Sequence, residues 1–286
     1  MPTLLSIGHG YSARHLAPLL QDEGWRIIGT TRSPEKAEIL RAEGIEPVLW
    51  PGEDLSEWFG VATHLLTSVA PGEHGDPVLR EYADALRAET FDWVGYLSTV
   101  GVYGDRQGGW VDETSDLRPA TARGQARVEA EAEWAALGLP LHVFRIAGIY
   151  GPGRGPFAKI RRGTARRIVK PGQVFSRIHV EDIAAVLHAS IHQPHPGGIY
   201  NLCDDEPAPP EDVVAHAADL LGVERPPEIP FDEAEMTPMA ASFYAESKRC
   251  SNRRIKEELG VSLRYPTYRE GLAAILEAEG QASQRS

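Results

Sequence analysis

The sequence predicts an α/β protein built on a parallel sheet. Short apolar runs alternate with amphipathic segments of helical spacing, which is the pattern of successive βαβ units. The apolar runs are continuous rather than alternating in polarity, as expected of strands that are buried on both faces. The glycine-containing stretch Gly8–Ala13 follows the first of these runs directly. Together these features favour a parallel sheet covered by helices.

The individual elements can be placed in order along the chain. The first helix carries Leu16, Leu19 and Leu20 at helical spacing, and the second begins with Pro34 at its first turn. Strands are expected at Thr3–Ile7, Trp25–Gly29, Ile45–Trp50, His64–Val69, Trp93–Ser98, Leu141–Ile146 and Gly198–Leu202. Helices are expected at Ser12–Gln21, Pro34–Glu43, Pro77–Arg87, 121–137 and Val180–Ile191.

The regular alternation breaks near Pro152. Residues Arg154–Arg177 are rich in Gly and Arg, and Arg225–Pro238 is rich in proline. We interpret these irregular stretches as a smaller second domain. The expected division is a nucleotide-binding domain over 1–153, to which 177–204 returns, and a smaller substrate-binding region over 154–176 and 205–286.

Composition excludes several classes of protein. The 286 residues include 29 Lys and Arg against 41 Asp and Glu, and the net charge of −12 argues against a nucleic-acid partner. Cys203 and Cys250 are too few for a disulfide framework and lack zinc-site spacing. No apolar run reaches the roughly 18 residues of a membrane span, and no signal peptide is recognisable. We therefore expect a cytoplasmic protein without a membrane partner.

The stretch Gly8–Ala13 fits the G-x-G-x-x-A pattern of a dinucleotide-binding turn. Gly8 permits the tight turn, Gly10 lets the backbone approach a pyrophosphate, and Ala13 permits close packing of helix on strand. The start of the helix, including Tyr11 and Ser12, offers N–H groups to the phosphates. A tight turn without a ligand is the alternative.

The end of the second strand selects the cofactor. NAD enzymes usually place an acidic residue there for the ribose 2′-hydroxyl, whereas this chain has Thr31, Arg32 and Ser33 and no acid before Glu35. Arg32 is a permanent cation whose fork suits a phosphate. We therefore expect NADP rather than NAD, the alternative for Arg32 being an ordinary solvated arginine.

The end of the fourth strand supplies a further expectation. The carboxyl ends of parallel strands meet at the ligand crevice. Ser68, Val69 and Ala70 are therefore expected near the cofactor, unless this segment is a plain exit from the strand.

Several motifs follow one another along the chain: the glycine turn, Tyr96–Gly104 with its Ser-Thr-Val-Gly-Val-Tyr-Gly exit, Val111–Thr114, Phe144–Gly153, Ile178–Ala184 and Lys248–Gly260. In this order they resemble the extended short-chain dehydrogenase/reductase family, in its NAD(P)-dependent epimerase/dehydratase branch. The resemblance covers nearly the whole chain. It implies a Rossmann-like, doubly wound parallel sheet with a small C-terminal substrate domain, and a homodimer formed through Rossmann-domain helices.

The family's catalytic pair is where this chain departs from the pattern. The family uses Tyr-x-x-x-Lys for proton transfer and ribose binding, with a Ser or Thr that polarises the substrate oxygen. Thr99 stands at the Ser/Thr position, but Arg123 and Arg127 stand where the tyrosine and lysine belong. Arginine stays protonated and cannot act as a general base. Tyr103 is one candidate for the missing acid–base group, and a surface charge stripe is the alternative reading of the arginines.

The substrate region offers cationic candidates. Residues Arg154–Arg177 contain eight basic residues and no acidic one, which predicts a pocket that attracts an anion, unless it is a solvated basic face. Arg177, His179 and Tyr150 are the expected substrate contacts. His188 and His192 have i, i+4 spacing, but no Cys or carboxylate accompanies them in a recognisable metal pattern, so we expect surface histidines and no metal.

Two functions remain open at this point. The first is an NADP(H)-dependent oxidoreductase or epimerase/dehydratase with an atypical site, acting on a small, anionic molecule. Thr99 would polarise the substrate oxygen, Arg127 would hold ribose or phosphate, and Arg123 would stabilise negative charge. The second is a catalytically inactive NADP(H) sensor that signals its ligand state to a protein partner. The missing Tyr and Lys support the sensor, and the substrate identity stays open.

Overall fold

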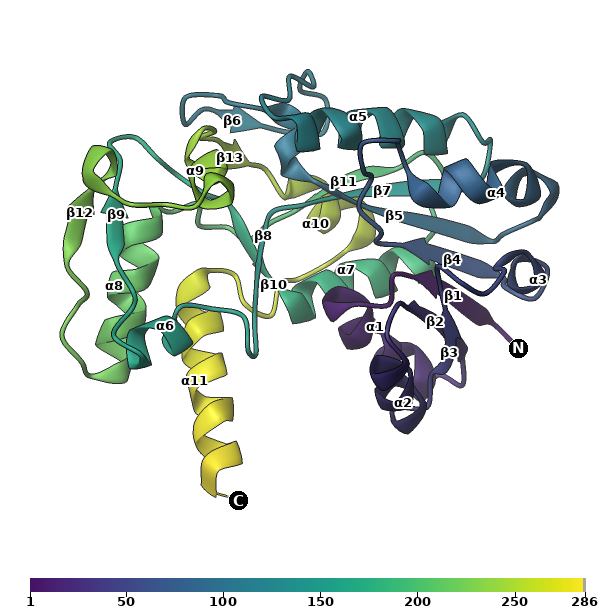
Figure 1. The fold of residues 1–286 in the computed structure, drawn as a ribbon, viewed down its shortest axis with the longest axis horizontal. Coiled ribbons are helices and arrows are strands. Elements are labelled where there is room, and N and C mark those ends of the chain that lie inside the picture. The colour runs from purple at the N-terminus through teal and green to yellow at the C-terminus, as the bar shows by residue number, and fades with distance from the viewer. Residues whose placement is uncertain (285–286) are drawn as a thin grey trace.

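A seven-stranded parallel sheet runs through the protein (Figure 1), in a computed structural model that describes residues 1–284. The strand order is β11-β7-β5-β4-β1-β2-β3, and every neighbouring pair is parallel. The order reverses direction between β1 and β4, so the sheet is doubly wound. The strands are β1 (Thr3–Ile7), β2 (Arg26–Thr31), β3 (Glu46–Leu49), β4 (His64–Thr67), β5 (Trp93–Thr99), β7 (Leu141–Ile146) and β11 (Ile199–Leu202).

Helices cover both faces of this sheet (Figure 1). One face carries α1 (Tyr11–Asp22), α2 (Pro34–Ala42) and α7 (Val180–His192), and the other carries α3 (Ser56–Phe59), α4 (Pro77–Ala88) and α5 (Ala122–Ala135). Successive strand residues point to opposite faces. Leu4 accordingly packs with the first group of helices and Leu5 with the second, in two separate apolar cores. The predicted α/β class with a doubly wound parallel sheet is confirmed.

The remaining elements form a smaller region with a core of its own. Tyr150, Phe157, Val213 and Leu272 belong to that core, and β8 pairs with β10 while β9 pairs with β12. The elements are β8 (Gly148–Tyr150), α6 (Phe157–Arg161), β9 (Arg167–Val169), β10 (Arg177–His179), α8 (Pro210–Leu221), β12 (Glu228–Pro230), η2 (Phe231–Glu233), α9 (Pro238–Tyr244) and α11 (Tyr268–Gln284). The residue boundaries of the two regions stay a prediction.

Three further elements lie beside the sheet. The one-turn helix η1 (Val100–Tyr103) follows β5, and β6 (Trp110–Val111) pairs with β13 (Arg249–Cys250) ahead of α10 (Arg253–Leu259). Within residues 1–284, no helix is long and apolar enough to cross a membrane.

Candidate functional site

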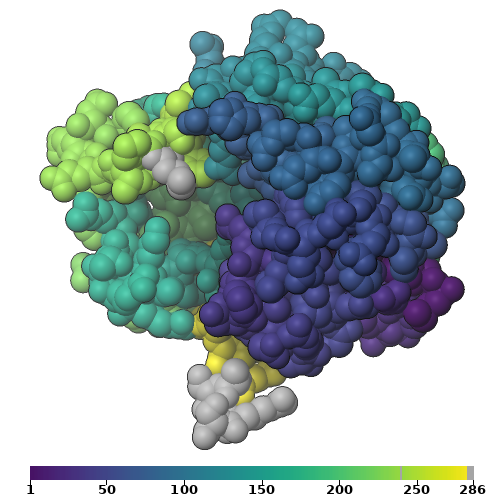
Figure 2. Space-filling model, turned by 45° about the vertical axis from the view of Figure 1, so that its right-hand side comes forward, coloured from purple at the N-terminus to yellow at the C-terminus, as the bar shows by residue number. Residues whose placement is uncertain are grey.

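The carboxyl ends of β1 and β4 define the candidate site. These strands are neighbours in the sheet, and the connections that leave them run in opposite directions, which is where doubly wound proteins bind ligands. Figure 2 shows a recess between the purple and blue N-terminal half and the teal and green segments of the smaller region. The predicted cofactor and catalytic segments meet at this end of the sheet.

Gly8 occupies the turn after β1 because no other residue fits there. Its φ is +77°, and a Cβ would lie 2.9 Å from Ser68 Oγ and 3.0 Å from Val69 Cγ2. The turn is fastened to the adjacent strand β2, where Thr30 Oγ1 accepts from the Gly8 N–H at 2.7 Å. The Ser68 hydroxyl donates to the Gly8 carbonyl on the β4 side. The turn is therefore held rigidly between two strand ends.

The N-terminus of α1 is open to a ligand. Gly10 is its N-cap, no side chain caps the helix, and a Cβ at Gly10 would meet only the Gly8 carbonyl, at 3.6 Å. Uncapped N–H groups at a helix start attract anions. Ser12 and Ala13 are buried beneath this turn, and Tyr11 reaches across to the smaller region, where its hydroxyl donates to the Pro152 carbonyl at 3.0 Å.

Arg154 extends the positive charge at this turn. Its guanidinium carbon lies 5.5 Å from the centre of the Tyr11 ring, and its side chain is exposed and has no acidic partner among residues 1–284. Sequence reasoning treated Arg154 only as one member of a basic stretch. Its contact with Tyr11 depends on the approach of segments 141 residues apart, for which the sequence carries no local signal.

The end of β2 carries an unpaired cation. Arg32 is exposed, and its guanidinium makes no hydrogen bond or ion pair to any described residue. Ser33 caps α2 by accepting from the Lys36 N–H at 3.3 Å, and its hydroxyl donates to Glu35. Thr31 is half-buried. The nearest acid in the sequence is therefore bound to Ser33, and Arg32 remains available.

His9 is an unexpected feature of the glycine turn. Its side chain is 7% exposed, and neither ring nitrogen has a hydrogen-bond partner among the described residues. The ring packs over Gly29 of β2, where a Cβ would lie 2.9 Å from the ring carbon Cγ. Burial lowers the pKa of His9 to about 4, so the ring is neutral at pH 7. Buried polar atoms without partners are uncommon, and these lie in the glycine turn.

Arg127 turns into the protein rather than toward solvent. It is 8% exposed, and one guanidinium nitrogen donates to the Tyr96 hydroxyl and the Leu97 carbonyl, both at 2.9 Å, and to the Val69 carbonyl at 3.5 Å. These acceptors belong to β5 and to the segment after β4. Arg127 thus joins α5 to the strand ends beneath Ser68–Ala70, where Ala70 itself is exposed.

Arg123 lies one turn earlier on α5 and is exposed, without a hydrogen bond or ion pair to any described residue. The neighbouring Gly124 explains the position of the helix, because a Cβ there would lie 3.0 Å from the Gly101 carbonyl in η1. The Thr99 hydroxyl accepts from the Gly101 N–H at 3.1 Å. The close approach of α5 to η1 therefore brings Arg123 and Thr99 to the same end of the sheet.

Tyr103, the candidate acid–base group, is placed elsewhere. It is fully buried, its hydroxyl donates to Asn201 at 2.7 Å and accepts from Arg145 at 3.0 Å, and burial raises its pKa to about 12. Arg145 also forms a two-pronged ion pair with Glu131, with its closest contact at 2.7 Å. Tyr103 therefore belongs to a buried polar network, and its expected role in proton transfer stays a prediction that this placement does not favour.

The expected substrate contacts Tyr150 and His179 are also internal. Their exposures are 7% and 1%, and the His179 ring lies between Tyr150 and Tyr265, with ring centres 5.2 and 4.1 Å away. Burial lowers the pKa of His179 to about 4. The side chain of Asp182, in the same motif, accepts from the Arg264 N–H at 2.7 Å. This motif fastens the C-terminal segment to α7, and the expected substrate contacts of Tyr150 and His179 stay predictions.

Arg177 is mostly buried and is held by backbone carbonyls. It donates to Phe175 at 2.9 Å and to Ala208 at 3.0 Å, and burial lowers its pKa. Beside it, burial raises the pKa of Asp204 to about 8, although the Arg177 charge opposes that shift. Arg177 therefore joins segments of the smaller region, and its expected role as a substrate anchor stays a prediction.

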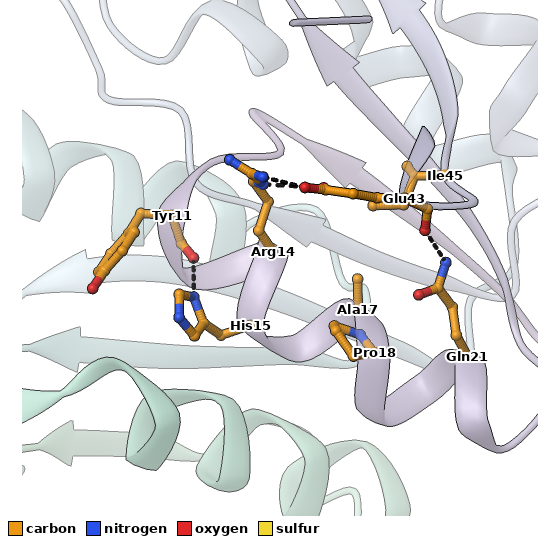
Figure 3. A pocket seen from close by; sticks show the side chains of 8 residues that line it. All are labelled: Tyr11, Arg14, His15, Ala17, Pro18, Gln21, Glu43 and Ile45. Atoms are coloured by element: carbon orange, nitrogen blue, oxygen red, sulfur yellow. Dashed lines mark hydrogen bonds and ion pairs between the residues drawn. The ribbon is translucent and has the colours of Figure 1, made fainter. Parts of the chain in front are cut away.

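A surface hollow beside α1 lies outside this site (Figure 3). Its polar side chains are already paired, because Arg14 binds Glu43 and Gln21 donates to the Glu43 carbonyl at 2.9 Å. It therefore presents few free polar groups to a ligand. Its lining comprises Tyr11, Arg14, His15, Ala17, Pro18, Gln21, Glu43 and Ile45.

Comparisons with known proteins agree with this architecture. No family model matches the chain. A conserved protein of unknown function from Silicibacter pomeroyi DSS is 59% identical, with a TM-score of 0.93, over 98% of this chain and 99% of that one. Protein YeeZ of Escherichia coli strain K12 is 28% identical over 284 residues, which is 93% of this chain and 97% of YeeZ. UDP-glucuronic acid 4-epimerase from Bacillus cereus, solved in complex with NAD, shares the fold with a TM-score of 0.78 at 15% identity, over 98% of this chain and 99% of the epimerase.

The chain shares the fold of NAD-dependent epimerases and dehydratases, and it resembles the extended short-chain dehydrogenase/reductase family. Arg123 and Arg127 stand where the sequence pattern of that family predicts the Tyr-x-x-x-Lys pair. The structure gives those two arginines different surroundings, since one is exposed and unpaired while the other is buried and bonded to three acceptors.

Proposed function

We propose that this protein binds NADP(H) at the carboxyl ends of β1, β2 and β4. The single observation that carries the proposal is Arg32, an exposed guanidinium without a partner among the described residues, at the end of β2. An arginine there can bind a 2′-phosphate, whereas a carboxylate would bind the unmodified ribose. The uncapped start of α1 and the open Gly10 suit the pyrophosphate.

Calorimetric titration with NADPH and NADH tests the cofactor. Removing Arg32 deletes a charged hydrogen-bonding group worth about 1.5–3 kcal/mol, so Arg32→Ala should bind NADPH about 10- to 100-fold more weakly while its NADH affinity stays within about twofold. Arg41→Ala is the matched control, because Arg41 lies on the adjacent helix and pairs with Glu38. Equal NADPH affinity in wild type and Arg32→Ala would refute the assignment.

We further propose that the protein is an oxidoreductase acting on a small anionic substrate. Bound NADPH would supply a hydride. Thr99 would donate its hydroxyl hydrogen to the substrate oxygen, and Arg123 would stabilise the negative charge that develops there. Arg123 cannot give up its own proton at working pH, so the proton that completes the product would come from water. The unpaired Arg123 and Arg154 support an anionic substrate.

A screen of small carboxylate- and phosphate-bearing carbonyl compounds, followed by NADPH oxidation, tests this activity. For a substrate so found, Arg123→Ala should lower kcat at least tenfold with little change in NADPH affinity, and Arg123→Lys should recover part of the loss. Arg118→Ala is the control, since Arg118 is exposed and pairs with Asp116. Unchanged turnover in Arg123→Ala would remove Arg123 from the mechanism.

One observation favours a second candidate, a catalytically silent NADP(H) sensor. The Arg127 guanidinium donates its hydrogen bonds to Tyr96, Leu97 and Val69. The residue at the position of the family's catalytic lysine therefore makes contacts within the protein. A sensor would bind NADPH tightly, fail to oxidise it with any compound of the screen, and change its association with a partner when the nucleotide binds. Turnover with any substrate would favour the enzyme.

A further inference from the structure

Three potential metal ligands converge on the surface at the end of α1 farthest from the glycine turn. Glu23 directly follows α1, and His188 and His192 lie one turn apart on α7. The two helices run side by side against the sheet (Figure 1). The carboxylate missing from the local sequence pattern is thus supplied from a position 165 residues away from His188.

The atoms of the cluster are already close to a coordinating arrangement. His188 Nε2 lies 2.6 Å from Glu23 Oε1, and His192 Nε2 lies 2.9 Å from Glu23 Oε2. One ligand atom from each residue can be chosen so that all lie within 4.8 Å of one another. Tetrahedral zinc with bonds of about 2.0–2.1 Å needs ligand atoms about 3.3 Å apart, which small side-chain rotations provide.

The chemistry of the three groups matches a transition metal. Two imidazoles and a carboxylate form a common ligand set for zinc. In the present arrangement the carboxylate accepts from both Nε2 atoms, so a metal ion would replace the two ring protons.

The surroundings hold the ligands while leaving room for an ion. The side chains of Glu23, His188 and His192 are 36%, 30% and 43% exposed, so one side of the cluster faces solvent. The ring of Trp25 stands edge-on to His192, with ring centres 6.2 Å apart, which restricts that imidazole. The backbone positions are fixed because both histidines lie on a helix packed against the sheet.

We propose that Glu23, His188 and His192 form a binding site for a divalent zinc-class ion, with the fourth coordination position open to solvent. The ion would join the end of α1 to α7. The site is separate from the proposed nucleotide site, because it lies at the opposite end of α1 from Gly10.

Calorimetric titration of the full chain with ZnCl2 in a non-chelating buffer tests the site. We expect one ion per chain for the wild type, binding at least tenfold weaker in His188→Ala, His192→Ala and Glu23→Gln, and unchanged binding in His195→Ala. His195 is the matched control, since it is an exposed histidine in the same segment. All four changes are at exposed or half-buried positions, and unfolding curves without metal confirm that each variant folds.

Two further readouts distinguish the site from loose surface binding. Co2+ should give the visible absorption bands of a four- or five-coordinate ion, and Zn2+ should raise the Tm of wild type and His195→Ala but not of the three ligand variants. Failure of the wild type to bind Zn2+ saturably would overturn the proposal. Equal binding by wild type and His188→Ala, or loss of binding in His195→Ala, would overturn this ligand set.

Discussion

Replacing Arg127 with methionine separates its structural role from a role in cofactor binding. The guanidinium is 8% exposed and donates to Tyr96, Leu97 and Val69. Arg127→Met keeps an unbranched apolar stem but leaves these buried acceptors without their donor. Buried hydrogen bonds to charged groups contribute about 1.5–3 kcal/mol each, and the methionine recovers some burial energy. We therefore expect a loss of about 2–4 kcal/mol in the free energy of unfolding.

The same reasoning gives the expected shift in Tm and its control. An unfolding entropy of about 2.1 cal/mol/K per residue makes 1 kcal/mol equivalent to roughly 2 °C for a chain of this length, so Tm should fall by about 4–8 °C. Arg123→Met, one helical turn away at an exposed and unpaired position, should stay within about 0.5 kcal/mol of wild type. Urea unfolding measures both variants. If Arg127→Met were as stable as Arg123→Met, the hydrogen bonds of Arg127 would contribute nothing to the free energy of unfolding, and its structural role would be refuted.

Three further changes have defined outcomes. Glu131→Gln should cost about 3–5 kcal/mol in urea unfolding, because it leaves the buried Arg145 charge half paired; replacing both by Leu and Met should recover most of the loss. Gly8→Ala should lower Tm and abolish NADPH binding in calorimetry, because its Cβ would lie 2.9 Å from Ser68 Oγ at a φ of +77°. Burial raises the folded-state pKa of Asp204 to about 8, so its stabilisation is complete below the unfolded pKa near 3.9 and is lost as the pH rises toward 8. Asp204→Asn should therefore gain stability relative to wild type between pH 4 and 8, and parallel urea midpoints across that range would contradict the assignment.

The sheet and its glycine turn could be predicted from the sequence because their signals are local. A continuous apolar run of residues marks each buried strand, and the spacing of Gly8 and Gly10 is fixed by the turn that they form. Boundaries moved by a few residues, as in β2, which spans Arg26–Thr31 rather than 25–29. Residues 154–177, for which the sequence predicts no element, contain α6, β9 and the start of β10, whose short apolar stretches carry little periodicity.

The direction of a side chain is what the sequence could not supply. The motif around His179 resembles a family motif in its letters, yet the ring packs between two tyrosines. Arg123 and Arg127 are both arginines on one helix, and only the packing of α5 on β5 buries the second. Glu23 belongs with His188 only because the fold places α1 against α7. Each of these outcomes depends on contacts between segments far apart in the chain.

The positions of Arg123 and Arg127 on α5 determine what each can contribute to the proposed chemistry. The buried Arg127 joins α5 to the strand ends, and the close approach of α5 to η1 brings Arg123 to the same end of the sheet as Thr99. Arg123 offers fixed positive charge without a proton to transfer, so the proposed reaction gains electrostatic stabilisation but no acid from the helix. A tyrosine acid would produce a pH dependence in kcat as it titrates, whereas arginine remains charged throughout. We therefore expect any fall in kcat between pH 7 and 10 to have the same midpoint in wild type and in Arg123→Lys. A midpoint that differs in Arg123→Lys would show that a proton does pass through this position.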